Sequence, residues 1–253
     1  MLEILLLVLA GFGAGLVTGF FGGSATLVVV PVLVLFGGYH PYLAIGLALA
    51  IDVSSSIAAF LTYNIKKNIR IGPAIPLIVS ALIGVVIGSF VSIRIPEKLL
   101  LLLAGTGMLI ASIRFTLAHT KLMNGKRIFL RDGKLSSILW GFVNGIGLGV
   151  IGGGGGIVLL LGLTVLLRYP IHKAVGISVL GMVFIAFFGA VSHYVLMPFS
   201  ILSLVIGSFA GVLGAISTSR FANKIPEKKF NIIIGGILTI LATSLLVKGI
   251  FFI

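Results

Sequence analysis

The chain has 253 residues, of which 59% are hydrophobic and only 9% are charged, and its mean hydropathy is +1.30. A water-soluble surface needs about 25–35% charged residues, so this composition excludes a soluble domain and predicts an integral membrane protein. The net charge of +13 does not indicate a nucleic-acid binder, because the basic residues lie in short loops between apolar runs. Cysteine is absent, which excludes disulfides, thiolate metal sites and cysteine nucleophiles.

Ten apolar segments follow one another along the chain, and runs of about 20 residues are long enough to cross a hydrocarbon core about 30 Å thick as helices. The start, Met1-Leu2-Glu3, lacks the basic residues of a signal peptide and is expected to open the first helix. An all-α membrane protein is therefore predicted. The expected helices are 2–21, 24–37, 42–64, 72–93 and 97–115, then 136–151, 154–167, 173–194, 200–221 and 228–250.

The second half of the chain repeats the first at a constant offset of 130 residues. The run GFFGGSATL that begins at Gly19 returns as GVIGGGGGI from Gly149, and the tetrapeptide IPEK at 95–98 recurs at 225–228. Matching glycines alone are weak evidence in a glycine-rich membrane protein, but an in-register IPEK in a loop indicates a tandem duplication. We expect a first membrane repeat at 1–115, a basic linker at 116–135 and a second membrane repeat at 136–253.

The basic residues predict how the chain crosses the membrane. The loop between the third and fourth segments is basic in the first half, whereas in the second half the basic loop precedes the third segment. Placing all basic loops in the cytoplasm puts 15 of the 18 Lys and Arg residues inside and leaves Arg94, Lys98 and Lys248 outside. This arrangement predicts a multi-pass protein of the inner (plasma) membrane with both termini outside, a cytoplasmic linker and two inverted repeats.

Inverted halves require an odd number of crossings in each half. The second segment of each half spans about 14 residues, or about 21 Å as a helix, which is short for the hydrocarbon core. We therefore favour a re-entrant hairpin made by the first two segments, followed by three transmembrane helices, although two full crossings stay open. The glycine-rich tips of the hairpins are then expected near the midplane, where irregular backbone is tolerated only if it is buried in protein or lines a wet cavity.

The hairpin tips are the predicted substrate site. A helix that starts at such a tip directs unpaired backbone N–H groups and the positive end of its dipole into the protein, which favours an anion. The Ser24 and Thr26 hydroxyls can cap the helix or donate to ligand oxygens. The alternative, that the glycines only allow close helix packing, is preferred for Gly11, Gly15, Gly19, Gly84 and Gly88. The predicted substrate-binding residues are Gly22, Gly23, Ser24, Thr26, Gly152, Gly153, Gly154, Gly155, Gly156 and Ser178.

Asp52 is the one acidic residue well inside an apolar segment, and its repeat counterpart is Met182. A carboxyl at mid-membrane is a functional candidate, here as the site of a proton coupled to transport. A structural acid bonded to Ser54, Ser55 or Ser56 is equally compatible with the sequence. Ser178 and Asn144 can line a cavity or join helices. His193 lies at a helix end, where placement at a membrane interface is preferred to a role as a proton relay. No residues have metal-ligand spacing, and no cofactor is expected.

Together these features resemble the TauE/SafE family of sulfite exporters. The resemblance rests on two glycine-rich hairpins, an Ala-x-Gly element after each (Ala44 to Gly46 and Ala174 to Gly176) and a basic loop between the halves. It implies an inner-membrane transporter for sulfite, sulfonates or related organosulfur anions. The chain departs from a symmetric pattern in having Ser24-Ala25-Thr26 where the second half has Gly154-Gly155-Gly156.

The predicted function is secondary transport of a small sulfur-containing anion, coupled to protons. The expected partners are an inorganic or organosulfur anion and the lipid bilayer, without nucleic acid; the oligomeric state stays open. A passive anion channel and a permease for a different small anion are the alternatives. An enzyme is disfavoured, because the membrane segments contain no paired acids and no nucleophile with a base.

Overall fold

The computed structural model describes residues 1–22, 24–62, 71–117, 133–152, 155–221 and 227–251, and these residues are helical apart from short turns and caps. The apolar runs form helices because a membrane span must satisfy its backbone hydrogen bonds within itself. The elements of the first half are α1 (Leu2–Phe21), α2 (Thr26–Phe36), α3 (Pro41–Thr62), the 3-10 turn η1 (Gly72–Ala74), α4 (Ile75–Ser92) and α5 (Glu97–Leu117). Those of the second half are α6 (Gly133–Ile151), α7 (Gly155–Leu161), the π-helical turn η2 (Gly162–Leu166), α8 (Ile171–Leu196), α9 (Ile201–Phe221) and α10 (Glu227–Phe251).

The predicted segments agree with these helices to within a few residues. The largest differences are at α6, which begins three residues earlier than expected, and at α8, which is longer at both ends. The elements also correspond in order across the 130-residue offset: α1 with α6, α2 with α7 and η2, α3 with α8, α4 with α9, and α5 with α10.

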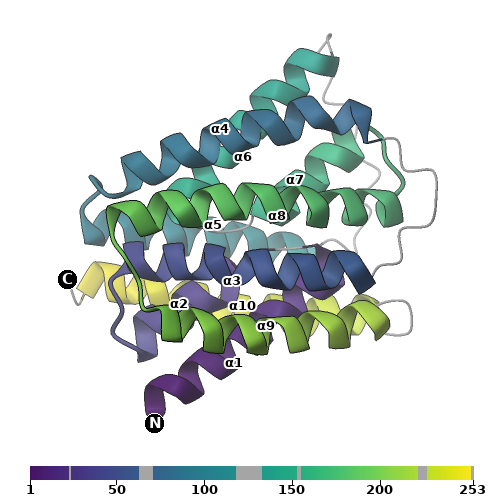
Figure 1. The fold of residues 1–253 in the computed structure, drawn as a ribbon. Coiled ribbons are helices and arrows are strands. Elements are labelled where there is room, and N and C mark those ends of the chain that lie inside the picture. The colour runs from purple at the N-terminus through teal and green to yellow at the C-terminus, as the bar shows by residue number, and fades with distance from the viewer. Residues whose placement is uncertain (23, 63–70, 118–132, 153–154, 222–226, 252–253) are drawn as a thin grey trace.

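The matched helices run in opposite directions through the bundle (Figure 1). In that view α3 and α5 run from left to right, whereas their counterparts α8 and α10 run from right to left. The two chain ends marked N and C both lie toward the left. Contacts at this end join distant parts of the chain, since Tyr39 donates a hydrogen bond to Glu3 and Lys248 Nζ donates to the Val34 carbonyl at 2.7 Å.

Seven helices in the described part of the chain are long and apolar enough to cross a membrane, which supports the predicted multi-pass protein. They are Leu2–Phe20, Pro41–Thr62, Gly72–Ser92, Lys134–Ile151, Lys173–Leu196, Ile201–Arg220 and Ile232–Phe251. The repeat predicts that α5 also crosses, but hydropathy selects its counterpart α10 and not α5. Most of the outward-facing side chains of these helices are apolar and suited to lipid; Val143, Phe209 and Ile240, for example, are each more than 65% exposed.

Glycines join the two halves by close helix packing. Each glycine in two sets spaced by four residues lies against a backbone carbonyl of the partner helix, so that an added Cβ would come within 2.5 Å of that oxygen. In the first set Gly11, Gly15 and Gly19 of α1 face Gly207, Gly211 and Ala215 of α9. In the second set Gly141, Gly145 and Gly149 of α6 face Leu77, Ala81 and Val85 of α4. Each contact of the first set corresponds to one of the second at the 130-residue offset, since Gly11 matches Gly141 and Gly207 matches Leu77, so the packing itself recurs.

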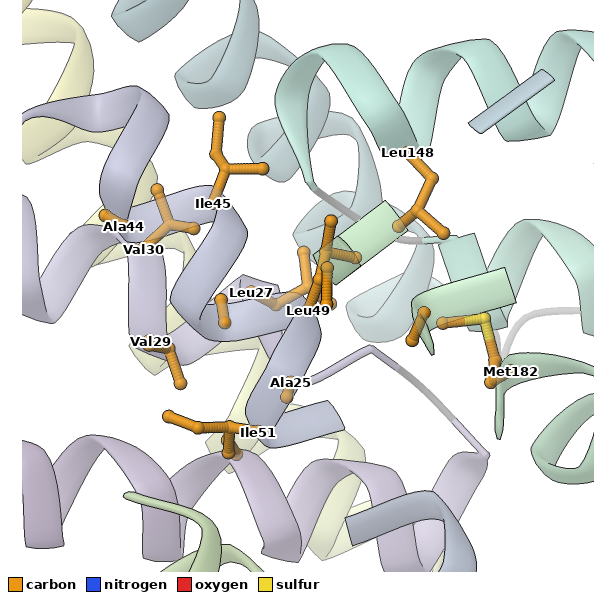
Figure 2. Close-up of a cluster of buried hydrophobic side chains, with 14 of the residues drawn as sticks. Ala25, Leu27, Val29, Val30, Ala44, Ile45, Leu49, Ile51, Leu148 and Met182 are labelled. Atoms are coloured by element: carbon orange, nitrogen blue, oxygen red, sulfur yellow. The ribbon is translucent and has the colours of Figure 1, made fainter. Parts of the chain in front are cut away.

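The remaining core lies around the hairpin ends. Figure 2 shows buried apolar side chains of α2, α3 and α8 gathered beside the end of α6, including Leu49, Leu148 and Met182. Met182 has no exposed surface, as expected for a helix in the middle of the bundle. The half-length helices end in this core: α2 has 11 residues, about 17 Å of helix, and α7 has 7 before its π-helical turn.

Candidate functional site

Two turns of the same shape end the long helices α1 and α6. Gly22 follows α1 with φ +62° and Gly152 follows α6 with φ +66°. The two glycines are 130 residues apart in the sequence. Each backbone N–H caps its helix, because Gly22 donates to the Thr18 carbonyl at 2.9 Å and Gly152 donates to the Leu148 carbonyl at 2.8 Å. The left-handed conformation favours glycine, so these two residues fix the turns of both hairpins.

Each turn packs against a helix of the other half of the chain. A Cβ added to Gly22 would meet Val175 and Val179 of α8, whereas one added to Gly152 would meet Ile45 of α3 and Thr26. Ile45 and Val175 are themselves repeat counterparts. Each hairpin tip therefore contacts the long third helix of the other half. Gly23, Gly153 and Gly154 belong to the predicted site but lie outside the described residues.

Asp52 receives hydrogen bonds from hairpin 1, the unit formed by α1, α2 and the turn between them. Thr18 Oγ1 donates to Oδ1 at 3.2 Å, Ser24 Oγ donates to Oδ2 at 3.0 Å, and the backbone of Ala25 also bonds to the carboxyl. Ser56, one turn further along α3, donates to Oδ1 at 3.4 Å. Asp52 is the twelfth residue of the 22-residue α3, so the tip of hairpin 1 lies beside the middle of that helix.

The polar groups around Asp52 are sealed from solvent. Ser24 and Thr26, whose hydroxyl oxygens lie 2.7 Å apart, and the carboxyl itself are each no more than 1% exposed. The Ser24 hydroxyl bonds to Asp52, and α2 has no side-chain cap, so helix capping by Ser24 or Thr26 is not observed. Of the three serines considered from the sequence, only Ser56 bonds to the carboxyl.

Ser178 and Asn144 connect helices through backbone carbonyls of hairpin 2, the unit formed by α6, α7 and η2. Ser178 Oγ of α8 donates to the Gly156 carbonyl at 2.8 Å and lies 3.4 Å from the Gly22 carbonyl of hairpin 1. Asn144 Nδ2 donates to the Gly155 carbonyl at 3.2 Å. These side chains brace the hairpins, and Ser178 is the predicted site residue that touches both.

Two residues of the site region, Thr18 and Trp140, were missed from the sequence, and the surroundings of a third, His193, were not predicted. Thr18 is a single polar residue in an apolar helix, a weak signal that only its contact with Asp52 makes meaningful. Trp140 donates its indole N–H to the Val158 carbonyl at 2.9 Å, beside the π-helical turn. The burial of His193 could not be seen from the sequence: its side chain has no exposed surface, because its ring packs between α3 and the end of α6.

This arrangement is a helical membrane protein with a buried polar centre between two glycine-tipped hairpins, the architecture of a membrane transporter. The family model described as the sulfite exporter TauE/SafE matches residues 7–245. The chain belongs to this family, and the resemblance predicted from the sequence is confirmed.

Two proteins similar to this chain are also described as transporters. The Probable membrane transporter protein MJ0441 of Methanocaldococcus jannaschii is 26% identical over 266 residues, covering 95% of this chain and 94% of that protein. The Probable membrane transporter protein YdhB of Bacillus subtilis is 36% identical over 115 residues, covering 44% of this chain and 45% of YdhB, so that match spans less than half of each. No solved structure matches the chain significantly.

Proposed function

We propose that the protein is a secondary transporter that moves a small sulfur-containing anion, such as sulfite or a sulfonate, across the plasma membrane together with a proton. The family supplies the anion class, since its model is described as a sulfite exporter. The observation that carries the proposal is the contact between the tip of hairpin 1 and a fully buried carboxyl at the middle of α3.

The buried Asp52 carboxyl needs a partner for its charge. In the described part of the chain, Asp52 accepts hydrogen bonds from hydroxyls of hairpin 1 and α3 and from the backbone of hairpin 1. The contact between an acidic and a basic side chain among these residues is that of Glu97 with His40, and it does not involve Asp52. A buried carboxylate without a basic partner is costly, and binding a proton removes that charge. The site is therefore suited to take up and release a proton.

Proton binding and anion binding are coupled through shared donors. When Asp52 is charged, it accepts the Ser24 hydroxyl and the backbone of Ala25, the groups that an anion at this tip also needs. Protonation weakens that competition and removes the repulsion between two negative charges, so each ligand favours the other. The substrate then lies between the tips, with Gly22, Gly23, Ser24 and Thr26 on one side. The residues proposed on the other side are Gly152, Gly153, Gly154, Gly155, Gly156 and Ser178.

The opposed directions of matched helices support inverted repeats at 1–115 and 136–253 (Figure 1), a construction that gives alternating access to one central site. The charge distribution supports termini outside and the linker 116–135 in the cytoplasm. Because the protein has no cysteine, Lys134→Cys and Ser200→Cys, both exposed positions, can be labelled cleanly. Labelling of Ser200→Cys and not Lys134→Cys from outside the cell is expected; the reverse would overturn the topology.

Binding and flux test the transport proposal. Purified protein is first screened by thermal shift against sulfite, sulfate, thiosulfate, taurine and sulfoacetate, since a ligand that binds only the folded state raises the melting temperature. Flux of the best ligand is then measured in proteoliposomes with and without a pH gradient. Saturable flux that the gradient stimulates supports a proton-coupled carrier, whereas gradient-independent, non-saturating flux indicates a channel.

Asp52→Asn is the decisive variant. It should abolish gradient-driven flux while retaining anion binding, and its anion affinity should no longer change with pH, whereas the affinity of the unmodified protein should rise as pH falls. Ser54→Ala is the matched control on the same helix, because the Ser54 hydroxyl donates to the Ile51 carbonyl and not to Asp52. Unchanged pH dependence in Asp52→Asn would show that Asp52 is structural.

A further inference from the structure

A buried tyrosine and histidine pair joins both halves of the molecule near the end of the bundle where the chain begins. The rings of Tyr42 and His193 have centroids 4.2 Å apart, and neither side chain is more than 1% exposed. Tyr42 is the second residue of α3, and His193 lies in the last turn of α8. Neither residue takes part in the binding site proposed above.

The pair continues into hydrogen bonds to two further helices. His193 Nε2 lies 3.0 Å from the Gly149 carbonyl of α6, and because a carbonyl only accepts, this nitrogen carries the proton and donates. The Tyr42 hydroxyl donates to the Ser89 carbonyl of α4 at 3.4 Å. One continuous chain of contacts therefore crosses α4, α3, α8 and α6, two helices from each repeat.

The bond to Gly149 acts on the turn that forms the tip of hairpin 2. Gly149 is three residues before Gly152, in the last turn of α6, where carbonyls lack helical partners. The His193 ring holds this turn against α8, and the space around it is filled, since a Cβ on Gly46 would come within 2.7 Å of the His193 Cβ. The position of the tip of hairpin 2 therefore depends on whether α3 and α8 are in contact at this end of the bundle.

At the 130-residue offset the same two residue types occur with their positions exchanged, histidine matching tyrosine and tyrosine matching histidine. His172 is the counterpart of Tyr42, and Tyr63 is the counterpart of His193. This is a property of the sequence, and the side chains of His172 and Tyr63 are not among those described.

We propose that Tyr42 and His193 are positioning residues that latch the outer side of the transporter, holding the tip of hairpin 2 in place while that side is closed. The inference rests on the proposed function for the assignment of the outer side. Opening this side separates the rings and releases the Gly149 carbonyl, which allows α6 and its tip to move relative to α8. Loss of the latch therefore exposes the space between the tip and α3 to the outside.

A single cysteine at Ile45 reports on that space. Ile45 has no exposed surface and faces Gly152. With Ile45→Cys in the otherwise unmodified protein, a membrane-impermeant thiol reagent applied to intact cells should react slowly. Adding His193→Leu should raise the labelling rate at least tenfold, and His193→Gln, whose amide can still donate to the Gly149 carbonyl, should restore most of the protection.

Val175→Cys is the matched control, because Val175 is the repeat counterpart of Ile45 and faces Gly22 from the other half. Its labelling by a membrane-permeant reagent should stay constant. If His193→Leu raised the labelling rate equally at both cysteines, the substitution would have loosened the whole protein. If it did not raise the rate at Ile45→Cys, the Tyr42–His193 contact would only fill space in the core. Either result overturns the latch. If His193→Leu does not fold, Tyr42→Phe, which keeps the ring and loses the bond to Ser89, should still raise labelling about threefold, and an unchanged rate would again reject the proposal.

This labelling needs no substrate, so the latch and the proposed function fail separately. If the unmodified protein transports none of the sulfur anions while the labelling pattern is as expected, the substrate assignment fails and the latch stands. If transport is normal and labelling does not respond to His193→Leu, the latch fails and the transport proposal stands.

Discussion

The two hairpins have the same backbone plan and opposite polar chemistry. In hairpin 1 the side chains converge on a carboxyl. In hairpin 2 the backbone carbonyls of Gly155, Gly156 and Val158 are the acceptors, bonded by two side chains of α6 and by Ser178 of α8. The oxygen-bearing residues of the first site are replaced at the offset by apolar residues or glycine: Thr18 by Leu148, Ser24 by Gly154, Thr26 by Gly156, Asp52 by Met182 and Ser56 by Ala186. Conversely, Trp140, Asn144 and Ser178 correspond to alanines.

This difference separates the features that recur at the 130-residue offset from those that do not. The left-handed turns, the helix caps and the glycine contacts recur in both halves, because each is set by backbone geometry that tolerates few side chains. The polar side chains do not recur, so each half satisfies a different group. As a result, the tip of hairpin 1 contacts the Asp52 carboxyl, whereas the tip of hairpin 2 is held by side chains that bond to its backbone.

Making the second half resemble the first should have the largest effect. Met182→Asp places a carboxyl at a fully buried position, and Leu148 and Ala186 stand where the counterparts Thr18 and Ser56 give hydroxyls to Asp52. The uncompensated charge should lower the free energy of unfolding by about 3–5 kcal/mol. Met182→Leu is the control, with an expected cost below about 1.5 kcal/mol. Thermal unfolding in detergent measures both, and equal stability of the two variants would mean that the halves are electrostatically alike.

Removing one hydroxyl from the first site should be the next largest effect. Ser24→Ala deletes a hydrogen bond to a charged group, which is worth about 1.5–3 kcal/mol. Because the bond needs the charge, most of the loss should disappear in the Asp52→Asn background. A double-mutant cycle at pH 8 measures this coupling. Additive effects would show that Ser24 and Asp52 act independently.

Much of this fold could be predicted from the sequence, because apolar length, loop charge and the glycine repeat are local signals. The apolar runs placed the helices of the described residues to within a few residues, and the offset paired Gly22 with Gly152. The polar partnerships could not be predicted in the same way. Thr18 and Asp52 are 34 residues apart and Ser178 and Gly22 are 156 apart, and only packing brings them together. The burial of His193 could not be predicted either, because it depends on the packing of α3 against α8 and α6.

The two hairpin turns should lose similar amounts of stability when a side chain is added. Gly22→Ala and Gly152→Ala each force an L-residue into a left-handed conformation, at a cost of about 1–2 kcal/mol. Both also press a Cβ against α8 or α3 at 3.0 Å, so anion affinity, measured by calorimetry in folded protein, should fall with stability. Retained affinity in both variants would place the substrate away from the tips.

Gly38→Ala isolates the backbone strain and should have the smallest effect. Gly38 has φ +66°, like Gly152, but a Cβ there meets nothing within 4 Å. Its repeat counterpart Arg168 already adopts φ +55° with a full side chain, so this turn tolerates substitution better than the tips do. We expect a loss of about 1 kcal/mol, the lower end of the range for the tip glycines, and unchanged anion affinity. The difference in affinity between Gly38→Ala and Gly152→Ala measures how much of the tip effect comes from the binding site and how much from conformation. Equal affinities would mean that the tip glycines serve only the turn.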